Sequence, residues 1–487
     1  MYRLFFCIAL ACAGGNLAGN DIYVSNLQFG AYDPVEYTLA ITFDLEWQHA
    51  WRVSTGPANH DAAWVFVKYR VNDGVWHHAG IGSSPALPAG AAGVTASDGR
   101  GAFIYPAGDF MGAADYNGVA LTLTLDPSFL YLAEGSIEVK VIAIEMVYVP
   151  EGDFELGSDG GESGEFYRTA ALIFSNGPYP VTGEAAMGYG VSFGDLTPGS
   201  FLGSLFLSET IPAAFPKGHA AFWCMKYETS QRQFTEFFNM LPPDARAWMD
   251  ISDLGANQAA LLANRNGFYW TGSGDAVTLY PQLPIGNLSA EHMMAYLDWS
   301  GLRPMTELEY EKACRGAADP VADEYAWGTD ALHGTAYTVE VADTEDEWIS
   351  NVSTSGTVGN GLYAGNASTG GPLRIGSFAA SGSAPGRPES GGSYFGIMEL
   401  SGNLSELTIT VANDNGRAYS GIHGDGSLTA AGAADVSGWP LGTDGYGHRG
   451  GSFATPAANL RVSHRGAASD AFTAAPSVGF RGVRTAE

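Results

Sequence analysis

The chain has 487 residues, with 52 acidic and 23 basic side chains and a formal net charge of −29. This length is too great for one ordinary core and predicts two or three compact units. The negative charge would repel phosphate backbones and anionic lipid headgroups, so we expect no binding to nucleic acid or to membrane surfaces. Hydrophobic residues make up 46% of the chain, which indicates globular folding rather than disorder.

The first 19 residues have the pattern of a secretory signal peptide. Arg3 precedes an apolar run that ends at Cys12, and small residues follow. Because the run is too short to span a bilayer, we expect cleavage by residue 19, bacterial-type export, and a secreted or cell-surface protein without membrane insertion. Lipid attachment at Cys12 is the alternative, although the residues before it match the usual motif weakly.

Cleavage of the signal peptide would leave two cysteines, Cys224 and Cys314. In an oxidising compartment, an isolated pair can form one disulfide. Both cysteines lie in strongly patterned segments of the same region, so we expect this disulfide. Two buried thiols that pack as small hydrophobic side chains are the alternative.

The N-terminal region has the period of β-strands. Residues 37–47 (YTLAITFDLEW) alternate apolar and polar side chains, and residues 119–125 and 137–141 repeat the pattern. The sequence Asn72-Asp73-Gly74 is a hairpin signal. Strands with one apolar face must pair face to face, so residues 20–143 are predicted to form an all-β, immunoglobulin-like sandwich. Residues 144–158 predict a strand pair across a turn at 150–153.

Three helices are predicted downstream from their N-terminal signals, followed by a region rich in Gly, Ser, Asn and Pro. The capping residues are Ser230 with Gln233, Ser289, and Thr306 with Glu309, and the third helix ends at Gly316. Residues 144–487 are therefore predicted to form an α+β domain with many loops. The whole chain is predicted to be a multidomain protein.

Several stretches of the C-terminal region resemble a known family in a fixed order. They are MVYVPEGDFELGS (146–158), FWCMKYETSQRQFTEFFN (222–239), PIGNLSAEHMMAYLDWSGLRPMTELEYEKACRG (284–316), YAWG (325–328), GIMELSGNLSEL (396–407), RGGSF (449–453) and GFRGVR (479–484). The ordered set resembles the formylglycine-generating-enzyme-like, or sulfatase-modifying-factor, family over residues 144–487. The resemblance implies a variant of the C-type lectin fold. Members include copper-dependent oxidases that convert a sulfatase cysteine to formylglycine, and secreted proteins with no known reaction.

The sequence departs from the oxidases of this family at two positions. In those enzymes, cysteines lie three and eight residues after the serine of the Gly-Gly-Ser segment. Counted from Ser452, these positions hold Thr455 and Leu460. Neither side chain forms a thiolate or offers copper(I) a soft ligand, so we expect no catalytic residues and no copper. A non-catalytic binding or structural module is predicted, and an oxidase or another activity in the same cleft is the alternative.

The resemblance also implies calcium as a structural ion. The stretch SGNLSEL (401–407) resembles a calcium loop of the family, Gly-Asn-x-x-Glu, and calcium prefers such oxygen ligands. Ser405 and Leu407 replace the usual tryptophans, so hydrogen bonding within the loop is the alternative. The acidic run at 343–347 is a further candidate patch. The implied ligands are Gly402, Asn403, Leu404 and Glu406, with Asn351 in a second loop.

Residues 454–478 correspond to the segment that carries ligand contacts in retroelement-diversified members of this fold. The resemblance therefore implies, as another alternative, a variable surface that binds a protein or a glycan. The candidate contacts are Trp439, Thr455, Asn459, His464 and Arg465. Most arginines near the C-terminus are instead interpreted as structural partners of carboxylates, namely Arg449, Arg461, Arg465, Arg481 and Arg484.

Overall fold

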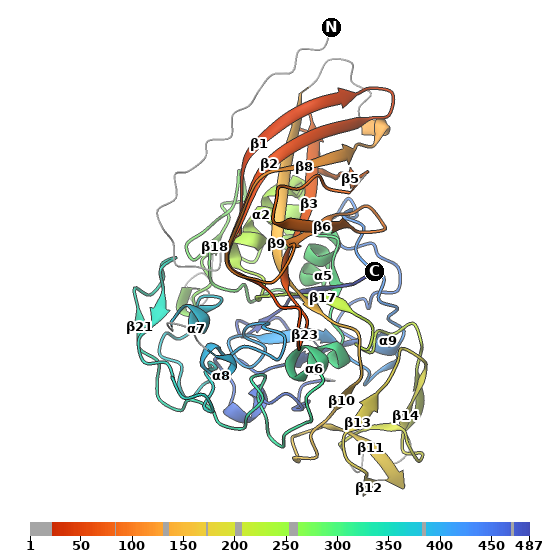
Figure 1. The fold of residues 1–487 in the computed structure, drawn as a ribbon, viewed down its shortest axis with the longest axis vertical. Helices are drawn as coiled ribbons and strands as arrows, with labels where there is room; N and C mark the ends of the chain where they lie inside the picture. The colour runs from red at the N-terminus through yellow and green to blue at the C-terminus, as the bar shows by residue number, and fades with distance from the viewer. Residues whose placement is uncertain are drawn as a thin grey trace.

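The computed structural model describes residues 22–82, 84–129, 136–171, 174–199, 207–252, 262–381, 386–468 and 472–487. The predicted signal peptide, with Cys7 and Cys12, lies outside the described residues. In these ranges no helix is both long enough and apolar enough to cross a membrane. Figure 1 shows long N-terminal strands that rise from a loop-rich body, which contains most of the helices.

A four-stranded antiparallel sheet forms one layer of the N-terminal region. Its strands, in spatial order, are β1 (Ile22–Asp33), β2 (Thr38–Arg52), β8 (Phe110–Thr124) and β5 (Gly80–Ile81). On β2, every second side chain from Leu39 to Trp47 is buried. The predicted period of two is confirmed on this strand.

An eight-stranded sheet forms the second layer and continues into the body. Its strands, in spatial order, are β20 (Arg303–Pro304), β26 (Gly482–Thr485), β17 (Phe222–Met225), β9 (Ile137–Val149), β3 (Asp61–Val71), β7 (Ala102–Pro106) and β6 (Ala91–Thr95), with β4 (His77–His78) beside β3. Asn72 and Asp73 have φ angles of 52° and 57° in the turn between β3 and β4. The predicted hairpin is confirmed by the pairing of these two strands.

The two sheets share an apolar cluster, and β3 is buried on both of its faces. Ala63, Val65 and Val67 pack with residues of β2 and β8 in that cluster. The alternate residues Trp64 and Phe66 pack with the helices of the body in a second cluster. Because successive side chains of a strand point to opposite faces, β3 joins the two cores.

The predicted boundary between residues 143 and 144 falls inside β9. This strand pairs with β3 from Ile137 to Val147, and its last residues also pair with β17. One continuous strand therefore belongs to both predicted units. The N-terminal region and the body share a sheet rather than being joined by a linker.

The three predicted helix starts are confirmed by their caps. Ser230 and Gln233 form a capping box at α2 (Gln231–Met240), Ser289 caps α5 (Ala290–Trp299), and Thr306 and Glu309 form the box of α6 (Glu307–Arg315). Gly316 follows α6 with a φ angle of 65°. The shorter helices are α3 (Pro243–Met249), α7 (Ser377–Ala380), α8 (Arg387–Ser390), α9 (Asp414–Arg417), η1 (Pro127–Phe129) and η2 (Ala457–Leu460).

The remaining strands form small sheets within the loops. They are β10 (Phe154–Leu156) with β13 (Tyr179–Val181), β18 (Phe268–Tyr269) with β19 (Val277–Thr278), β21 (Val339–Glu340) with β22 (Trp348–Ile349), and β24 (Tyr446–Arg449) with β23 (Ser405–Ile409) and β25 (Val478–Gly479). β10 pairs with β13 and not with β9, so the strand pair predicted over residues 144–158 is wrong.

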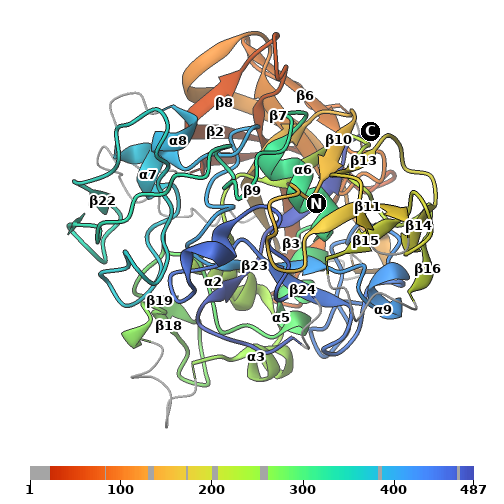
Figure 2. The same ribbon diagram turned by 90° about the horizontal axis from the view of Figure 1, so that it is seen from below.

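A five-stranded sheet lies at the rim of the body, close to α9 (Figure 2). Its strands, in spatial order, are β12 (Phe174–Ser175), β11 (Phe166–Ala171), β15 (Leu196–Pro198), β14 (Met187–Gly190) and β16 (Ser208–Ile211). The Nη2 atom of Arg417 in α9 lies 3.8 Å from a carboxylate oxygen of Glu209 in β16.

Candidate functional site

Thr455 lies just before η2 and is hydrogen-bonded within its own turn. Its Oγ1 atom accepts a hydrogen bond from the backbone N–H of Ser452 at 2.8 Å and donates one to the carbonyl of Ser452 at 3.1 Å. The carbonyl of Thr455 accepts a hydrogen bond from the N–H of Ala364. The hydroxyl therefore stabilises the loop.

Leu460, the last residue of η2, is a fully buried hydrophobic contact. It packs with Tyr325 and Trp327, whose rings are stacked with centroids 4.8 Å apart. A Cβ atom at Gly451 would lie 2.7 Å from Cδ1 of Leu460 and 2.8 Å from the backbone carbonyl carbon of Asn459, and φ of Gly451 is 61°, so the backbone needs glycine there. Leu460 thus fills this position with hydrocarbon and brings no donor atom to it.

The two cysteines of the body are free thiols, so the predicted disulfide is wrong. Cys224 on β17 and Cys314 on α6 pack in one apolar cluster as small hydrophobic side chains. Burial raises the pKa of each thiol to about 12. Neither is therefore a thiolate near neutral pH.

The predicted calcium loop is tied to a glutamate on a distant segment. Asn403, with a φ angle of 65°, donates from Nδ2 to Oε2 of Glu228 at 2.5 Å. The N–H of Leu404 donates to Oε1 of Glu228 at 2.8 Å, and Oδ1 of Asn403 accepts from the N–H of Leu373. Both ends of the Asn403 amide are therefore used to hold the loop.

Three glutamates, Glu228, Glu399 and Glu406, form a group that we name the buried glutamate cluster. Arg481 donates two hydrogen bonds to Oε1 of Glu406, and the N–H of Gly376 donates one to Oε1 of Glu399. The Oε2 atoms of Glu399 and Glu406 are buried and have no hydrogen-bond partner. Such oxygens are costly unless a further group binds them.

Burial and repulsion by neighbouring carboxylates disfavour the ionised forms of Glu228 and Glu399. Burial, with the charges of Glu406 and Glu399, holds the pKa of Glu228 well above its usual range. Burial also raises the pKa of Glu399 to about 7, although Arg481 acts in the opposite direction. Three ionised carboxylates beside the Arg481 guanidinium would leave an excess of negative charge, which a divalent cation would neutralise.

Two oxygens of the buried glutamate cluster are of the kind that calcium binds. Calcium takes six to eight oxygen ligands from carboxylates and carbonyls. Glu399 and Glu406 each offer a buried oxygen without a partner, and Gly402 and Leu404 lie in the loop between them. The predicted ligand Asn403 is instead occupied by hydrogen bonds.

The second predicted calcium residue, Asn351, is hydrogen-bonded to backbone. Its Oδ1 accepts from the N–H of Thr338 at 2.7 Å, and its Nδ2 donates to the carbonyl of Ala336 at 2.9 Å. In the acidic run at 343–347, Asp343 and Glu347 form ion pairs with Arg265. This part of the run is an ion-pair network and not an open cation patch.

The predicted ligand-binding residues do not form one group. Trp439 is buried in the main core and donates to the carbonyl of Ile422. Arg465 is buried and donates from Nε and Nη2 to Glu307. Thr455, Asn459 and His464 are half-buried and lie in or beside η2.

The structural interpretation of the C-terminal arginines is confirmed, because each forms an ion pair. Arg449 and Arg465 share Glu307, and their charges outweigh burial and lower the pKa of that carboxyl group. The remaining pairs are Arg449 with Glu311, Arg461 with Asp323, Arg481 with Glu406, and Arg484 with Asp98.

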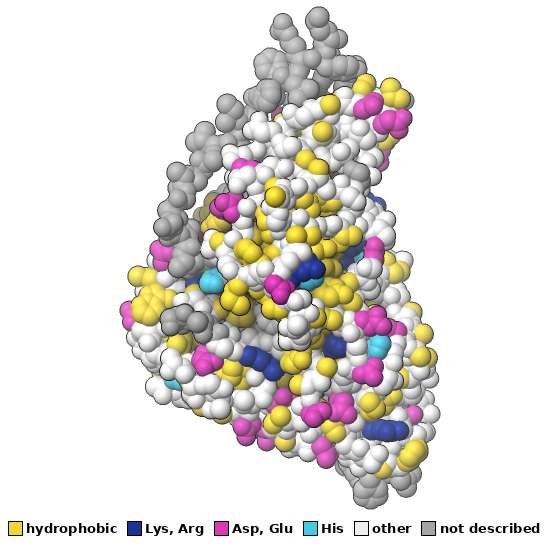
Figure 3. All heavy atoms as spheres, viewed as in Figure 1, with side chains coloured by type: hydrophobic (Ala, Val, Ile, Leu, Met, Phe, Trp, Pro, Cys, Tyr) yellow, Lys and Arg dark blue, Asp and Glu magenta, His cyan; other side chains and the backbone are white. Residues whose placement is uncertain are grey.

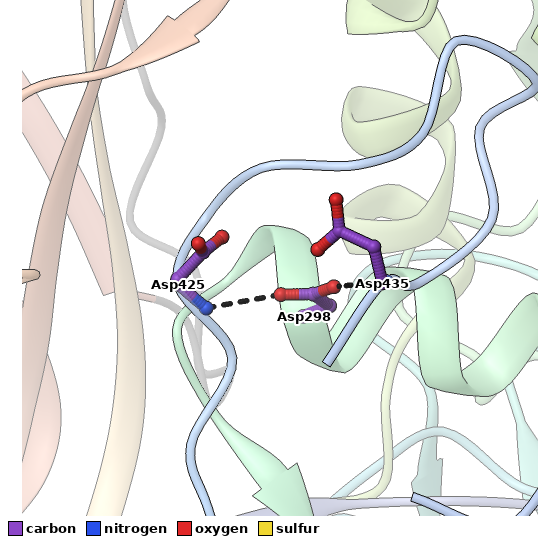
Figure 4. A group of neighbouring side chains, drawn as sticks. All are labelled: Asp298, Asp425 and Asp435. Carbon is purple, nitrogen blue, oxygen red and sulfur yellow. Dashed lines mark hydrogen bonds between the residues drawn. The ribbon is translucent and has the colours of Figure 1, made fainter. Parts of the chain in front are cut away.

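A second acidic group gave no sequence signal. Asp298 on α5 accepts hydrogen bonds from the backbone N–H groups of Asp425 and Asp435, both at 3.0 Å. Figure 4 shows its carboxylate between those two residues, and one carboxylate oxygen from each of the three residues lies within 4.8 Å of the other two. Asp298 is fully buried, whereas the other two are exposed. Burial raises the pKa of Asp298 to about 7.

The sequence was compared with the profiles of known protein families. Residues 138–486 match the profile of the sulfatase-modifying factor enzyme 1-like domain, FGE-sulfatase. The chain belongs to this family. The match begins in β9, so the sulfatase-modifying factor domain takes in the strand that it shares with the N-terminal region.

One known protein is similar to this chain in sequence, and another is similar to it in structure. The formylglycine-generating enzyme of Thermomonospora curvata is 27% identical over 111 residues, which are 22% of this chain and 31% of that protein. The chain thus matches less than a third of that relative's length. Variable protein 1 of Treponema denticola aligns with a TM-score of 0.31 and 14% identity, over 71% of this chain and 96% of that structure.

Sequence reasoning missed two members of the buried glutamate cluster. Glu228 lies 175 residues before Asn403, to which it is hydrogen-bonded. It directly precedes the capping segment of α2 and gives no metal-binding pattern there. Glu399 lies seven residues before Glu406 and has a φ angle of 56°. A positive φ at a glutamate is visible only in the folded backbone.

Proposed function

We propose that the chain is an exported, non-catalytic member of the sulfatase-modifying factor family that acts as a ligand-binding or structural module. In this proposal, an immunoglobulin-like sandwich is joined to a domain of the C-type lectin fold. The observation that carries it is the pair Thr455 and Leu460, at positions where the family's oxidases have cysteines. Copper(I) prefers thiolate ligands, and these residues supply none.

Their surroundings support the loss of copper chemistry. The Thr455 hydroxyl is bound within its turn, and Leu460 packs against aromatic rings. Cys224 and Cys314 do not replace the missing ligands, since burial keeps both as neutral thiols. Oxidation of a substrate cysteine would need a metal site that this segment does not provide.

A binding role is supported by the loop around η2. Thr455, Asn459 and His464 reach the surface there, while the buried Leu460 fixes the loop to the body. Binding residues commonly lie on loops held by a rigid scaffold. Residues 454–478 would form the variable surface of a diversified binder, and 469–471 lie outside the described residues.

The charge of the protein restricts its ligands. Figure 3 shows acidic side chains spread over the visible face with few basic ones between them. With a net charge of −29, attraction to polyanions is unfavourable, so we propose a protein or an uncharged glycan as ligand.

We also propose a structural calcium ion at the buried glutamate cluster. Glu399 and Glu406 would bind it through their Oε2 atoms, with loop carbonyls of Gly402 and Leu404 as further ligands. The ion would supply positive charge to buried carboxylates. Arg481 and the Glu228 hydrogen bonds hold the surrounding groups in place.

The experiment that tests the loss of copper chemistry is a copper(I) competition titration with a chromogenic chelator. Wild-type protein is expected to leave copper with the chelator. The double variant Thr455→Cys and Leu460→Cys is expected to gain one tight site. One equivalent of tightly bound copper in the wild type, retained after Cys224→Ser and Cys314→Ser, would refute the proposal.

A second experiment tests the binding surface. Wild-type protein is applied to immobilised neutral glycans and basic proteins, beside the variant Asn459→Ala and His464→Ala. The variant is expected to lose any binding found, with an unchanged melting temperature. Binding that is equally strong in both proteins would exclude the η2 loop as the contact surface.

A further inference from the structure

Three side chains bring an amine and two carboxylates together where the N-terminal region meets the sulfatase-modifying factor domain. Asp61 begins β3, Glu145 lies on β9, and Lys226 directly follows β17. β9 lies between β3 and β17 in the eight-stranded sheet. Glu145 is therefore on the middle strand of the three.

The strand register places all three side chains on one face of the sheet. Ala63 pairs with Glu145, and Asp61 lies two residues before Ala63. The backbone N–H of Lys226 donates to the carbonyl of Glu145 at 2.9 Å. Since alternate residues of a strand share a face, Asp61 and Lys226 reach toward Glu145 from opposite sides.

The contacts between these side chains are direct and buried. Nζ of Lys226 lies 3.0 Å from Oδ2 of Asp61 and 3.0 Å from Oε2 of Glu145. The side chains of the three residues are 4%, 0% and 3% exposed, respectively. A third contact of Nζ is the carbonyl of His49 at 3.1 Å. Burial of three ionisable groups is unfavourable unless they compensate one another closely.

Asp61 is further held by two donors from the facing layer. The N–H of Trp51 donates to Oδ1 at 3.0 Å, and Nε1 of Trp47 donates to Oδ2 at 3.1 Å. The Trp51 ring also covers the amine, with its centroid 4.9 Å from Nζ. Hydrogen-bond donors of this kind make a carboxyl carbon more electrophilic and stabilise the oxyanion formed by attack on it.

We propose that Lys226 and Asp61 form an intramolecular isopeptide bond, with Glu145 as the proton carrier. Glu145 takes a proton from the Lys226 ammonium, and the free amine attacks Cγ of the protonated Asp61 carboxyl group. A C–N bond forms, a C–O bond breaks, and Glu145 returns its proton to the departing hydroxyl group. The new amide nitrogen then gives its second proton to Glu145, which ends as the neutral acid. One water molecule leaves, and no oxidant, metal or other reactant is needed.

The surroundings favour this product. Burial raises the pKa of Asp61, so its protonated form is accessible. Burial would lower the pKa of Lys226, but Glu145, Tyr227 and Asp61 outweigh it and hold the pKa well above its usual range. The resting amine is therefore charged, and Glu145 must remove its proton as attack begins. Amide formation then replaces a buried cation and anion by a neutral group.

The bond would fasten β3 to the segment after β17. These residues are 165 positions apart in the chain, so the crosslink would close a long loop. It would hold β3 next to the segment after β17 even when the rest of the chain is unfolded. This role is independent of the proposed ligand and of calcium.

The first test is the intact mass of the mature protein, measured under denaturing conditions. The expected mass is that of the sequence minus one water, and a protease digest should contain a peptide that links Asp61 to Lys226. A measured mass equal to that of the sequence, with no loss of water, would overturn the proposal. So would a water loss that persists in Lys226→Arg, since dehydration elsewhere in the chain would then explain it.

A pair of variants on β9 tests the role of Glu145. Glu145→Gln keeps the size of the side chain but cannot carry the proton, and we expect bond formation to slow by about 100-fold or more. Glu138→Gln, on the same strand but half-exposed and paired with Arg70, should crosslink as the wild type does. Full crosslinking in Glu145→Gln would refute the proton-carrier role. If this variant does not fold, the mass of the wild-type protein still shows whether the isopeptide bond forms.

Discussion

Arg481 donates hydrogen bonds from both Nε and Nη2 to the same oxygen of Glu406, at 2.9 and 2.5 Å. The other oxygen of this buried carboxylate has no partner. A bidentate pair would have used both oxygens. The contact through one oxygen therefore leaves Oε2 of Glu406 without a partner, and Oε2 of Glu399 likewise has none.

Removal of calcium should destabilise the protein. We expect a chelator to lower the melting temperature of the wild type by several degrees, because a ligand at 100 times its Kd contributes about 2.7 kcal/mol. Glu399→Gln should lose this sensitivity, while Glu36→Gln, at an exposed position, should keep it. Calorimetry with and without chelator measures both. If the chelator does not change the melting temperature of the wild type, the loop is held by hydrogen bonds alone and binds no calcium.

Leu460 should be a major stabilising contact of the loop that carries the missing cysteine positions. Leu460→Ala is expected to lower the free energy of unfolding by about 2–5 kcal/mol, since it creates a cavity against Tyr325 and Trp327. Leu441→Ala, at a residue that is 79% exposed, should change it by less than about 0.5 kcal/mol. Denaturant titration compares the two. Equal losses of the free energy of unfolding in the two variants would show that the packing of Leu460 does not stabilise the loop.

Glu307 should be more important for stability than an exposed acid in a similar pair. Glu307→Gln leaves the buried Arg465 and Arg449 without their shared charge, and we expect a loss of about 3–5 kcal/mol. Asp414→Asn removes the partner of Arg417, but Asp414 is 91% exposed, so at most about 1 kcal/mol should be lost. A small effect at Glu307, measured by denaturant unfolding, would contradict the interpretation of these arginines as structural.

Asp298 should make stability depend on pH. Its pKa rises from 3.8 to about 7 on folding, so its stabilising contribution is complete below about pH 4 and is lost as the pH rises through 7. The loss is at most about 4 kcal/mol, because one pKa unit corresponds to about 1.4 kcal/mol. The stability of Asp298→Asn relative to the wild type should therefore increase between pH 5 and pH 8. A constant difference would show that Asp298 ionises normally.

Local sequence patterns predicted the elements well. The apolar side of β2 and the caps at Ser230, Ser289 and Thr306 depend on residues within a few positions of one another, and the structure confirms them. The ordered motifs also predicted the family, because each motif is a continuous stretch.

Relationships between distant residues were not predictable in the same way. The partner of β10 is β13, and the amine of Lys226 meets Asp61 only through three neighbouring strands. The disulfide prediction failed because two cysteines can share an apolar cluster without being bonded. The buried glutamate cluster likewise depends on Glu228, which no local pattern connects to Glu406.

The central claim is that Thr455 and Leu460 leave the sulfatase-modifying factor domain without oxidase chemistry. Its most direct test is incubation of the purified protein with copper, oxygen, a reductant and a sulfatase peptide that contains the target cysteine, followed by mass spectrometry of the peptide. The account predicts that the cysteine remains unchanged, while an active formylglycine-generating enzyme converts it in parallel. Formylglycine produced by this chain, and still produced after Cys224→Ser and Cys314→Ser, would contradict the account.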